Sequence, residues 1–140
     1  MKVKTLFLLG AASLFLATPA KADDKQIQCI AENAYHEARG EGQAGITAVS
    51  NVVMNRVKDR RFSSTPCGVV YERKGKNCQF SWTCKKSAIS NKTLFNRCKQ
   101  IAVNVYYNRI RDRTGGALFY HSTSISGSWF KRKLIRTPRS

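Results

Sequence analysis

Apolar residues recur at helical spacing in three stretches of the chain. The first stretch begins near Gln26, and the second runs from about Gln43 to Lys58. The third contains Leu94, Phe95, Cys98, Ile101, Ala102, Val105 and Ile110. Because residues three and four positions apart share one face of a helix, each stretch predicts an amphipathic helix that buries its apolar face.

Glycines interrupt two of these patterns. Gly40 and Gly42 follow the first stretch and predict a tight turn before the second helix. Gly115 and Gly116 supply the backbone freedom of a helix C-terminus and predict the end of the third helix. The basic segment 131–140 has little apolar content, so we expect it to be loosely ordered.

The segments between the helices carry weaker signals. Thr65 followed by Pro66 is typical of a helix N-cap and first turn, which predicts a short helix over residues 67–71. Residues 72–77 (ERKGKN) are expected to form a basic loop. Residues 117–120 are expected to be extended, and no repeat or second domain is evident.

The first 22 residues have the three parts of a secretory signal peptide. Residues 1–4 carry positive charge, residues 5–17 are almost entirely apolar, and Ala20-Lys21-Ala22 is a small-x-small cleavage site. Cleavage after Ala22 would leave a single exported domain, residues 23–140, in the periplasm or outside the cell. A retained signal anchor is the alternative, although the apolar run is shorter than the ~20 residues that span a bilayer.

All five cysteines lie after the predicted cleavage site, which agrees with export to an oxidising compartment. We expect disulfides with one cysteine left over, and the pairing stays open because spacing does not fix connectivity. The segment from Cys78 to Cys84 is the best candidate for a local disulfide. The cysteine and histidine spacing matches no common zinc site.

The charge of the chain predicts an anionic partner. The formal net charge is +17, and removal of Lys2, Lys4 and Lys21 with the signal peptide leaves +14. For an exported protein, the anionic polymers of the cell envelope are the expected partners, bound in a salt-dependent way. A non-catalytic cationic protein that binds the wall or membrane is one alternative. A nucleic-acid binder is another, but no nucleic-acid motif supports it.

Eight carboxylates are available for catalysis: Asp23, Asp24, Glu32, Glu37, Glu41, Asp59, Glu72 and Asp112. Glu37 falls at the edge of the apolar face of the first helix, where partial desolvation would favour the protonated acid that a glycosidase needs. Glu41, in the following turn, is a plausible assistant. The alternative is that Glu37 and Glu41 form ordinary ion pairs with Arg39 or Arg56.

The chain has few histidines that could bind a metal or activate a nucleophile. His36 and His121 are the only histidines, and His36 faces away from the apolar face of its helix. We therefore expect neither a metal centre nor a histidine-activated nucleophile, and a reaction without a cofactor.

Five ordered motifs resemble the SleB/CwlJ-type cell wall hydrolase family. They are residues 35–42 (YHEARGEG), 52–57 (VVMNRV), 67–71 (CGVVY), 78–82 (CQFSW) and 116–121 (GALFYH). Their order and number make the resemblance specific, and it extends over most of the chain.

The resemblance implies a fold, a substrate and a set of site residues. The fold would be a mainly α (α+β), lysozyme-like or lytic-transglycosylase-like domain with short extended segments, and the substrate would be the glycan strands of peptidoglycan. Glu37 would be the catalytic acid. Gln79 and Ser81 would line the saccharide groove, while Tyr120 and His121 would approach the sugar.

The scarcity of carboxylates bears on the mechanism. Hydrolysis by the usual route needs two carboxyl groups, and only Glu41 is near Glu37 in sequence. A lytic transglycosylase needs one glutamate, because the 6-hydroxyl of muramic acid attacks its own anomeric carbon. We therefore favour transglycosylation of the β-1,4 bond between N-acetylmuramic acid and N-acetylglucosamine, with muramidase hydrolysis as the alternative.

Overall fold

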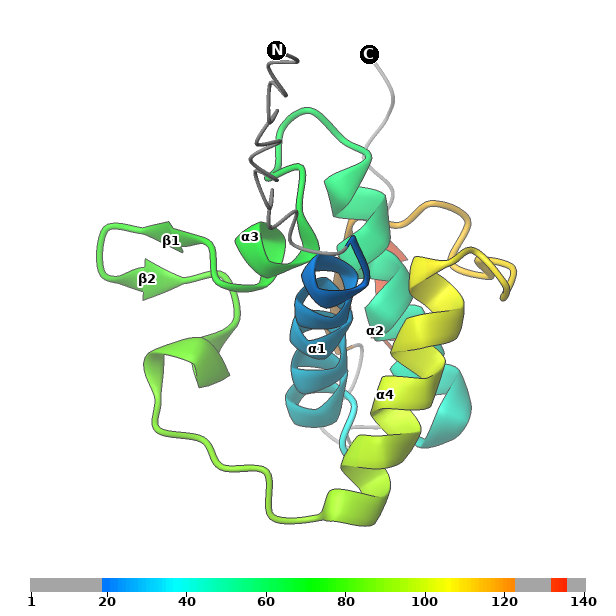
Figure 1. Ribbon diagram of the computed structural model, residues 1–140. Helices are drawn as coiled ribbons and strands as arrows, with labels where there is room; N and C mark the ends of the chain where they lie inside the picture. The colour runs from blue at the N-terminus through cyan, green and yellow to red at the C-terminus, as the bar shows by residue number, and fades with distance from the viewer. Residues whose placement is uncertain (1–18, 123–131, 136–140) are drawn as a thin grey trace, which may run out of the picture.

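The computed structural model describes residues 19–122 and 132–135, which form a small helical domain (Figure 1) with two two-stranded antiparallel sheets. In chain order the elements are α1 (Pro19–Glu37), α2 (Gly42–Val57), α3 (Pro66–Val70), β1 (Arg73–Lys74), β2 (Asn77–Cys78), the 3-10 helix η1 (Ser81–Cys84), α4 (Lys92–Tyr106), β3 (Phe119–Ser122) and β4 (Arg132–Ile135). The prediction of a mainly helical domain with short extended segments is confirmed.

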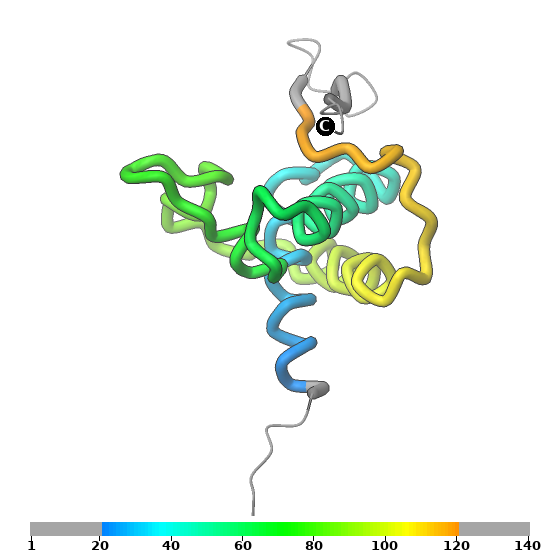
Figure 2. The backbone as a smooth tube through the Cα atoms, turned by 90° about the horizontal axis from the view of Figure 1, so that it is seen from above, coloured from blue at the N-terminus to red at the C-terminus, as the bar shows by residue number. Residues whose placement is uncertain are grey.

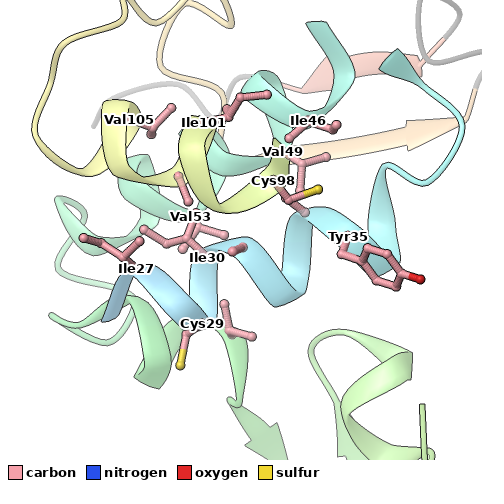
Figure 3. Packing of buried hydrophobic residues seen from close by; sticks show 14 of the residues in the cluster. Ile27, Cys29, Ile30, Tyr35, Ile46, Val49, Val53, Cys98, Ile101 and Val105 are labelled. Atoms are coloured by element: carbon pink, nitrogen blue, oxygen red, sulfur yellow. The ribbon is translucent and has the colours of Figure 1, made fainter. Parts of the chain in front are cut away.

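Helix α1 is the centre of the domain and packs against α2, α3 and α4. Its apolar face is fully buried, as the 3.6-residue pattern predicts. Figure 3 shows Ile30 of α1 lying beside Val53 of α2, and Cys98 of α4 lying beside Ile46 and Val49 of α2. Burial of these side chains is the main force that holds the three long helices together.

The first helix begins earlier than the apolar pattern predicts. It starts at Pro19, so the predicted cleavage site after Ala22 falls within its first turns. Asp23, the next residue, accepts hydrogen bonds from the hydroxyls of Tyr106 at 2.7 Å and Tyr107 at 3.3 Å. Residues 1–18, which hold most of the predicted signal peptide, lie outside the described residues. Within the described part of the chain, no helix combines the length and apolar character needed to cross a membrane.

The predicted turn between the first two helices is confirmed. Gly40 and Gly42 have φ of 90° and 66°, a region in which side chains with a Cβ are strained. The start of α3 is also confirmed, because the side chain of Thr65 accepts a hydrogen bond from the backbone N–H of Gly68 at 3.1 Å.

The prediction that the third helix continues to Gly115-Gly116 is wrong. Helix α4 ends at Tyr106, and Asn108 has a left-handed backbone with φ of 59°. The backbone N–H of Arg109 donates to the carbonyl of Asn104 at 2.7 Å, and that of Asn108 donates to Val105 at 3.1 Å. This is a Schellman motif, in which asparagine takes the place usually held by glycine.

Two segments expected to be irregular form strands instead. The basic segment 72–77 contains the β1–β2 hairpin, in which Arg73 pairs with Cys78 and Lys74 with Asn77. Figures 1 and 2 show this hairpin projecting from the helices. In the basic tail, β4 pairs antiparallel with β3, with Phe119 opposite Ile135. The expectation of a loosely ordered tail is therefore wrong for residues 132–135, whose order comes from backbone pairing; the rest of the tail is outside the described residues.

Two disulfides form and one cysteine is left over, as expected from the sequence. Cys78 pairs with Cys84, as the sequence suggested, and Cys29 pairs with Cys67, which ties α1 to α3. The fifth cysteine, Cys98, is a fully buried thiol in the core. Burial raises the pKa of Cys98 to about 11, so this thiol is packing material and not a reactive group.

Candidate active site

Glu37 and Tyr120 form the centre of the candidate site. Glu37 is the last residue of α1 and is half-buried, and Tyr120 lies in β3. The Tyr120 hydroxyl donates a hydrogen bond to Oε2 of Glu37 at 3.0 Å. Two of the residues predicted from the sequence are therefore in direct contact, although 83 positions separate them along the chain.

The segment that carries Tyr120 is anchored to α2 through Asn55. The amide nitrogen of Asn55 donates to Oδ2 of Asp112 at 2.9 Å and to the carbonyl of Ala117 at 3.1 Å. Burial opposes the ionisation of Asp112, but hydrogen bonds from Thr114, Asn55 and Gly116 outweigh it and lower the pKa of Asp112. The ionised carboxylate thus organises the loop that leads into β3.

Arg56 provides the second anchor, one residue further along α2. Its side chain is 3% exposed, and Nε donates to the carbonyl of Leu118 at 2.7 Å. The guanidinium carbon lies 5.2, 5.4 and 5.2 Å from the ring centroids of Phe62, Phe80 and Phe119. Burial lowers the pKa of Arg56, while the charges of Tyr120, Glu72 and Glu37 act to raise it.

An aromatic group borders the same helix one turn before Glu37. The indole nitrogen of Trp82 donates to Oδ1 of Asn33 at 2.9 Å, and the Trp82 ring stacks on His36 with 4.5 Å between centroids. Tyr71, which is 45% exposed, meets the edge of Trp82 at 5.7 Å. Asn33 is fully buried, and no hydrogen-bond partner for its Nδ2 is found in residues 19–122 and 132–135.

The segment between Cys78 and Cys84 places its side chains in two environments. Phe80 is buried, and its ring packs against the guanidinium of Arg56. Gln79 and Ser81, on either side of it, are exposed, so they are available to a ligand. Their role as saccharide contacts stays a prediction.

The structure does not test the predicted roles of two further residues, Glu41 and His121. Glu41 is half-buried in the turn between α1 and α2, and its backbone N–H donates to the carbonyl of Ala38 at 3.0 Å. Its role as an assistant to Glu37 stays a prediction. His121 follows Tyr120 in β3, but its side chain lies outside the described residues. Across the described ranges, no three or more His, Cys, Asp or Glu side chains are grouped to hold a metal ion.

Sequence reasoning missed three polar residues that build the site: Asn33, Asn55 and Arg56. A signal for two of them exists in the apolar pattern itself. Asn33 lies between the buried residues Ala31 and Ala34, and Arg56 falls three and seven positions after the buried Val53 and Val49. A polar residue on the buried face of a helix needs a hydrogen-bond partner, because burying an unpaired polar group is costly. Here those partners lie in the segments that build the candidate site.

Comparison with known proteins identifies the family. Residues 40–139 match the cell wall hydrolase family. The chain belongs to that family. The matched range begins three residues after Glu37, so the role of Glu37 is argued from the geometry.

Curated relatives and a solved structure extend the comparison. The chain is 29% identical over 122 residues to a spore cortex-lytic enzyme of Halalkalibacterium halodurans and 28% identical over 112 residues to one of Bacillus cereus. These alignments cover 84% and 79% of this chain, but only 34% and 39% of the relatives' own length. The crystal structure of the catalytic domain of the Bacillus cereus SleB protein is also similar, with a TM-score of 0.55 and 28% identity, covering 75% of this chain and 76% of that one.

Proposed function

We propose that this chain is an exported glycosidase that cleaves peptidoglycan between N-acetylmuramic acid and N-acetylglucosamine, with Glu37 as its acid and base. The observation that carries the proposal is the half-buried carboxyl group at the end of α1, held by the hydroxyl of Tyr120 at 3.0 Å. Membership of the cell wall hydrolase family supports the choice of substrate.

The proposed reaction requires one carboxyl group to act twice. Protonated Glu37 gives its proton to the glycosidic oxygen while the bond from that oxygen to C1 of muramic acid breaks. The 6-hydroxyl of the same muramic acid then attacks C1, forms the 1,6-anhydro bond and returns its proton to Glu37. In the interval the hydrogen bond from Tyr120 stabilises the ionised carboxylate and keeps it oriented.

Scarcity of acidic side chains favours this lytic transglycosylase route over hydrolysis. A hydrolase of the usual kind needs a second carboxyl group that activates water or attacks the sugar. Glu41, four residues after Glu37 in the turn, is the candidate for that role. A muramidase that uses Glu41 is therefore the second candidate function.

The remaining predicted contacts fit the same substrate. The exposed side chains of Gln79 and Ser81 would bind the saccharide, together with His121. The strong positive charge would attract the anionic polymers of the envelope, which the protein would meet after export and removal of residues 1–22.

The test uses the exported product of the full-length chain, its Glu37→Gln variant and a Glu41→Gln variant. Each is incubated with purified peptidoglycan, and soluble products are identified by mass spectrometry. We expect anhydro-muramic acid ends from the unmodified protein and a loss of at least about a hundredfold in Glu37→Gln. Glu32→Gln, a change on the same helix, is the matched control and should retain activity. The mass of the exported protein also tests cleavage after Ala22.

Each other outcome points to one alternative. Reducing muramic acid ends, lost in both Glu37→Gln and Glu41→Gln, would establish muramidase hydrolysis. Binding to peptidoglycan without any cleavage by folded protein would establish the non-catalytic cationic protein instead.

A further inference from the structure

Arg56 is buried, but its contacts within the described residues do not satisfy all the hydrogen-bond donors of its guanidinium group. A guanidinium ion is costly to remove from water unless it is paired and all its donors are satisfied. Here the side chain is 3% exposed, yet Nη1 has no hydrogen-bond partner among the residues that the structure describes. An unsatisfied buried donor destabilises the folded state, so this arginine is costly to stability.

Two of the contacts that Arg56 makes lead to the same short segment, Leu118 and Phe119. Nε holds the carbonyl of Leu118 at 2.7 Å, and the guanidinium carbon lies 5.2 Å from the ring centroid of Phe119. Phe62, Phe80 and Phe119 form an aromatic cage around the guanidinium. Within this cage the centroids of the Phe62 and Phe119 rings are 6.0 Å apart. The cation therefore fixes two consecutive residues through the backbone of one and the side chain of the other.

Fixing Leu118 and Phe119 also fixes Tyr120. Successive side chains of a strand point to opposite faces, so a Phe119 ring held against Arg56 leaves the Tyr120 side chain on the other face of β3. There its hydroxyl meets Oε2 of Glu37 at 3.0 Å. Hydrogen-bond strength falls steeply with distance and angle, so a small shift of β3 would break this contact.

We propose that Arg56 is a positioning residue of the candidate site: through Leu118 and Phe119 it holds the Tyr120 hydroxyl on Glu37. This inference rests on the function proposed above, because it assigns Arg56 a place in the action of Glu37. Lysine cannot replace arginine in this role. Its ammonium group lacks a donor at the Nε position and the flat surface that packs among three rings.

The test is a double-mutant cycle of Arg56→Lys and Tyr120→Phe, with kcat and KM measured on soluble glycan fragments of peptidoglycan. We expect each single change to lower kcat by about tenfold or more while KM moves by less than about twofold. In the Tyr120→Phe background, Arg56→Lys should cost less than about twofold further, because the contact that it supports is already gone. Arg97→Lys, at an exposed arginine of α4, is the matched control and should change nothing.

A purely structural arginine would give another pattern. The losses in kcat from Arg56→Lys and Tyr120→Phe would then multiply, and the inference would be overturned. Should Arg56→Lys fail to fold, Phe62→Leu removes one ring of the cage and leaves the arginine in place. It should show the same dependence on Tyr120 with a smaller loss, and multiplying losses would again overturn the inference.

Crystal structures separate this inference from the proposed function. In Arg56→Lys the distance between the Tyr120 hydroxyl and Glu37 should lengthen beyond about 3.5 Å, whether or not the protein cleaves glycans. An unchanged distance would overturn the positioning role. Cleavage that survives in Glu37→Gln would overturn the proposed function and leave the positioning result standing.

Discussion

The indole N–H of Trp82 donates to the side-chain oxygen of Asn33, one helical turn before Glu37. This bond joins the segment between the cysteines of the local disulfide to the buried face of α1. Asn33 is fully buried, so its oxygen depends on this donor. The bond also determines which way the amide is turned, and it leaves Nδ2 buried without a hydrogen-bond partner within the described part of the chain.

Trp82→Phe should destabilise the domain by about 1–3 kcal/mol, because it leaves the Asn33 oxygen buried without a donor. The aromatic contact with His36 is largely kept by phenylalanine, so the loss reports mainly on the hydrogen bond. Urea unfolding at neutral pH measures the change. Asn33→Ala combined with Trp82→Phe should cost less than the sum of the two single changes. Additive costs would show that the bond contributes nothing.

The two disulfides should differ in their effect on stability. Cys29–Cys67 closes a loop with a sequence separation of 38, whereas Cys78–Cys84 closes one of 6. In the chain-entropy account, replacing the first pair by alanine costs about 4 kcal/mol and replacing the second about 2 kcal/mol. Thermal unfolding of the two double variants tests this order. An equal or reversed order would contradict the entropic explanation.

The helices were predictable where periodicity alone decides structure. The apolar residues of α1 and α2 recur every three or four positions; α2 forms where expected, and α1 ends where expected but begins earlier, at Pro19. The end of α4 was misplaced because Ile110 continues the apolar spacing beyond Asn108, which terminates the helix through its left-handed backbone. Strand β4 was missed because residues 132–135 (RKLI) show no alternation, and their order depends on pairing with β3. Such pairing joins distant residues and leaves no local pattern.

His36 should make the stability of the domain depend on pH. Burial lowers the pKa of His36 from its ordinary value of 6.5, against the effect of Glu32 and together with that of Arg39. The unfolded chain therefore binds the proton more readily, and the free energy of unfolding should fall as the pH drops below about 6.5 toward the folded-state pKa.

The measurement is the free energy of unfolding between pH 7.5 and pH 5, compared with that of His36→Asn. The variant keeps His121, so the contribution of the other histidine cancels in the comparison. A smaller pH dependence in His36→Asn is the expected result. Identical curves, or a His36 NMR titration at or above 6.5, would show that burial does not govern this residue.

The basic hairpin should contribute more to wall binding than other basic segments of equal charge. Arg73, Lys74 and Lys76 are exposed on the β1–β2 hairpin, between Glu72, whose charge acts on Arg56, and Gln79. In Figures 1 and 2 the hairpin and the loop after α4 lie on opposite sides of the helices. Gln79, a predicted saccharide contact, directly follows β2, so a polymer bound to it would lie beside the hairpin.

Changing those three residues to glutamine, in the Glu37→Gln background, should weaken binding to insoluble peptidoglycan and reduce its salt dependence. Changing the three exposed arginines of the far loop, Arg109, Arg111 and Arg113, removes the same charge and is the matched control. Sedimentation assays at low and moderate salt compare the two. Equal weakening would show that only the net charge matters.

The candidate site was predictable in part. Its place at the edge of an apolar helix face made Glu37 a candidate, with ordinary ion pairs as the alternative, and the family resemblance made it the expected acid. Tyr120 came only from the resemblance of residues 116–121. The contact between them depends on the loop held by Asn55 and on the buried guanidinium of Arg56. Each of these joins residues about 60 positions apart, so their meeting follows from the packed fold and not from spacing.

The separation of Glu37 from Tyr120 has a consequence for the order of events during synthesis. The contact spans 83 residues, and all of α1, α2, α3 and α4 are made before Tyr120 leaves the ribosome. The core cluster lies within residues 27–105, so the helices can pack without β3, whereas Glu37 gains its hydroxyl partner only when β3 is in place. A chain that ends before β3 would thus contain the packed helices but lack the Tyr120 hydroxyl beside Glu37. On the proposed function, glycan cleavage would then depend on synthesis of the last strands.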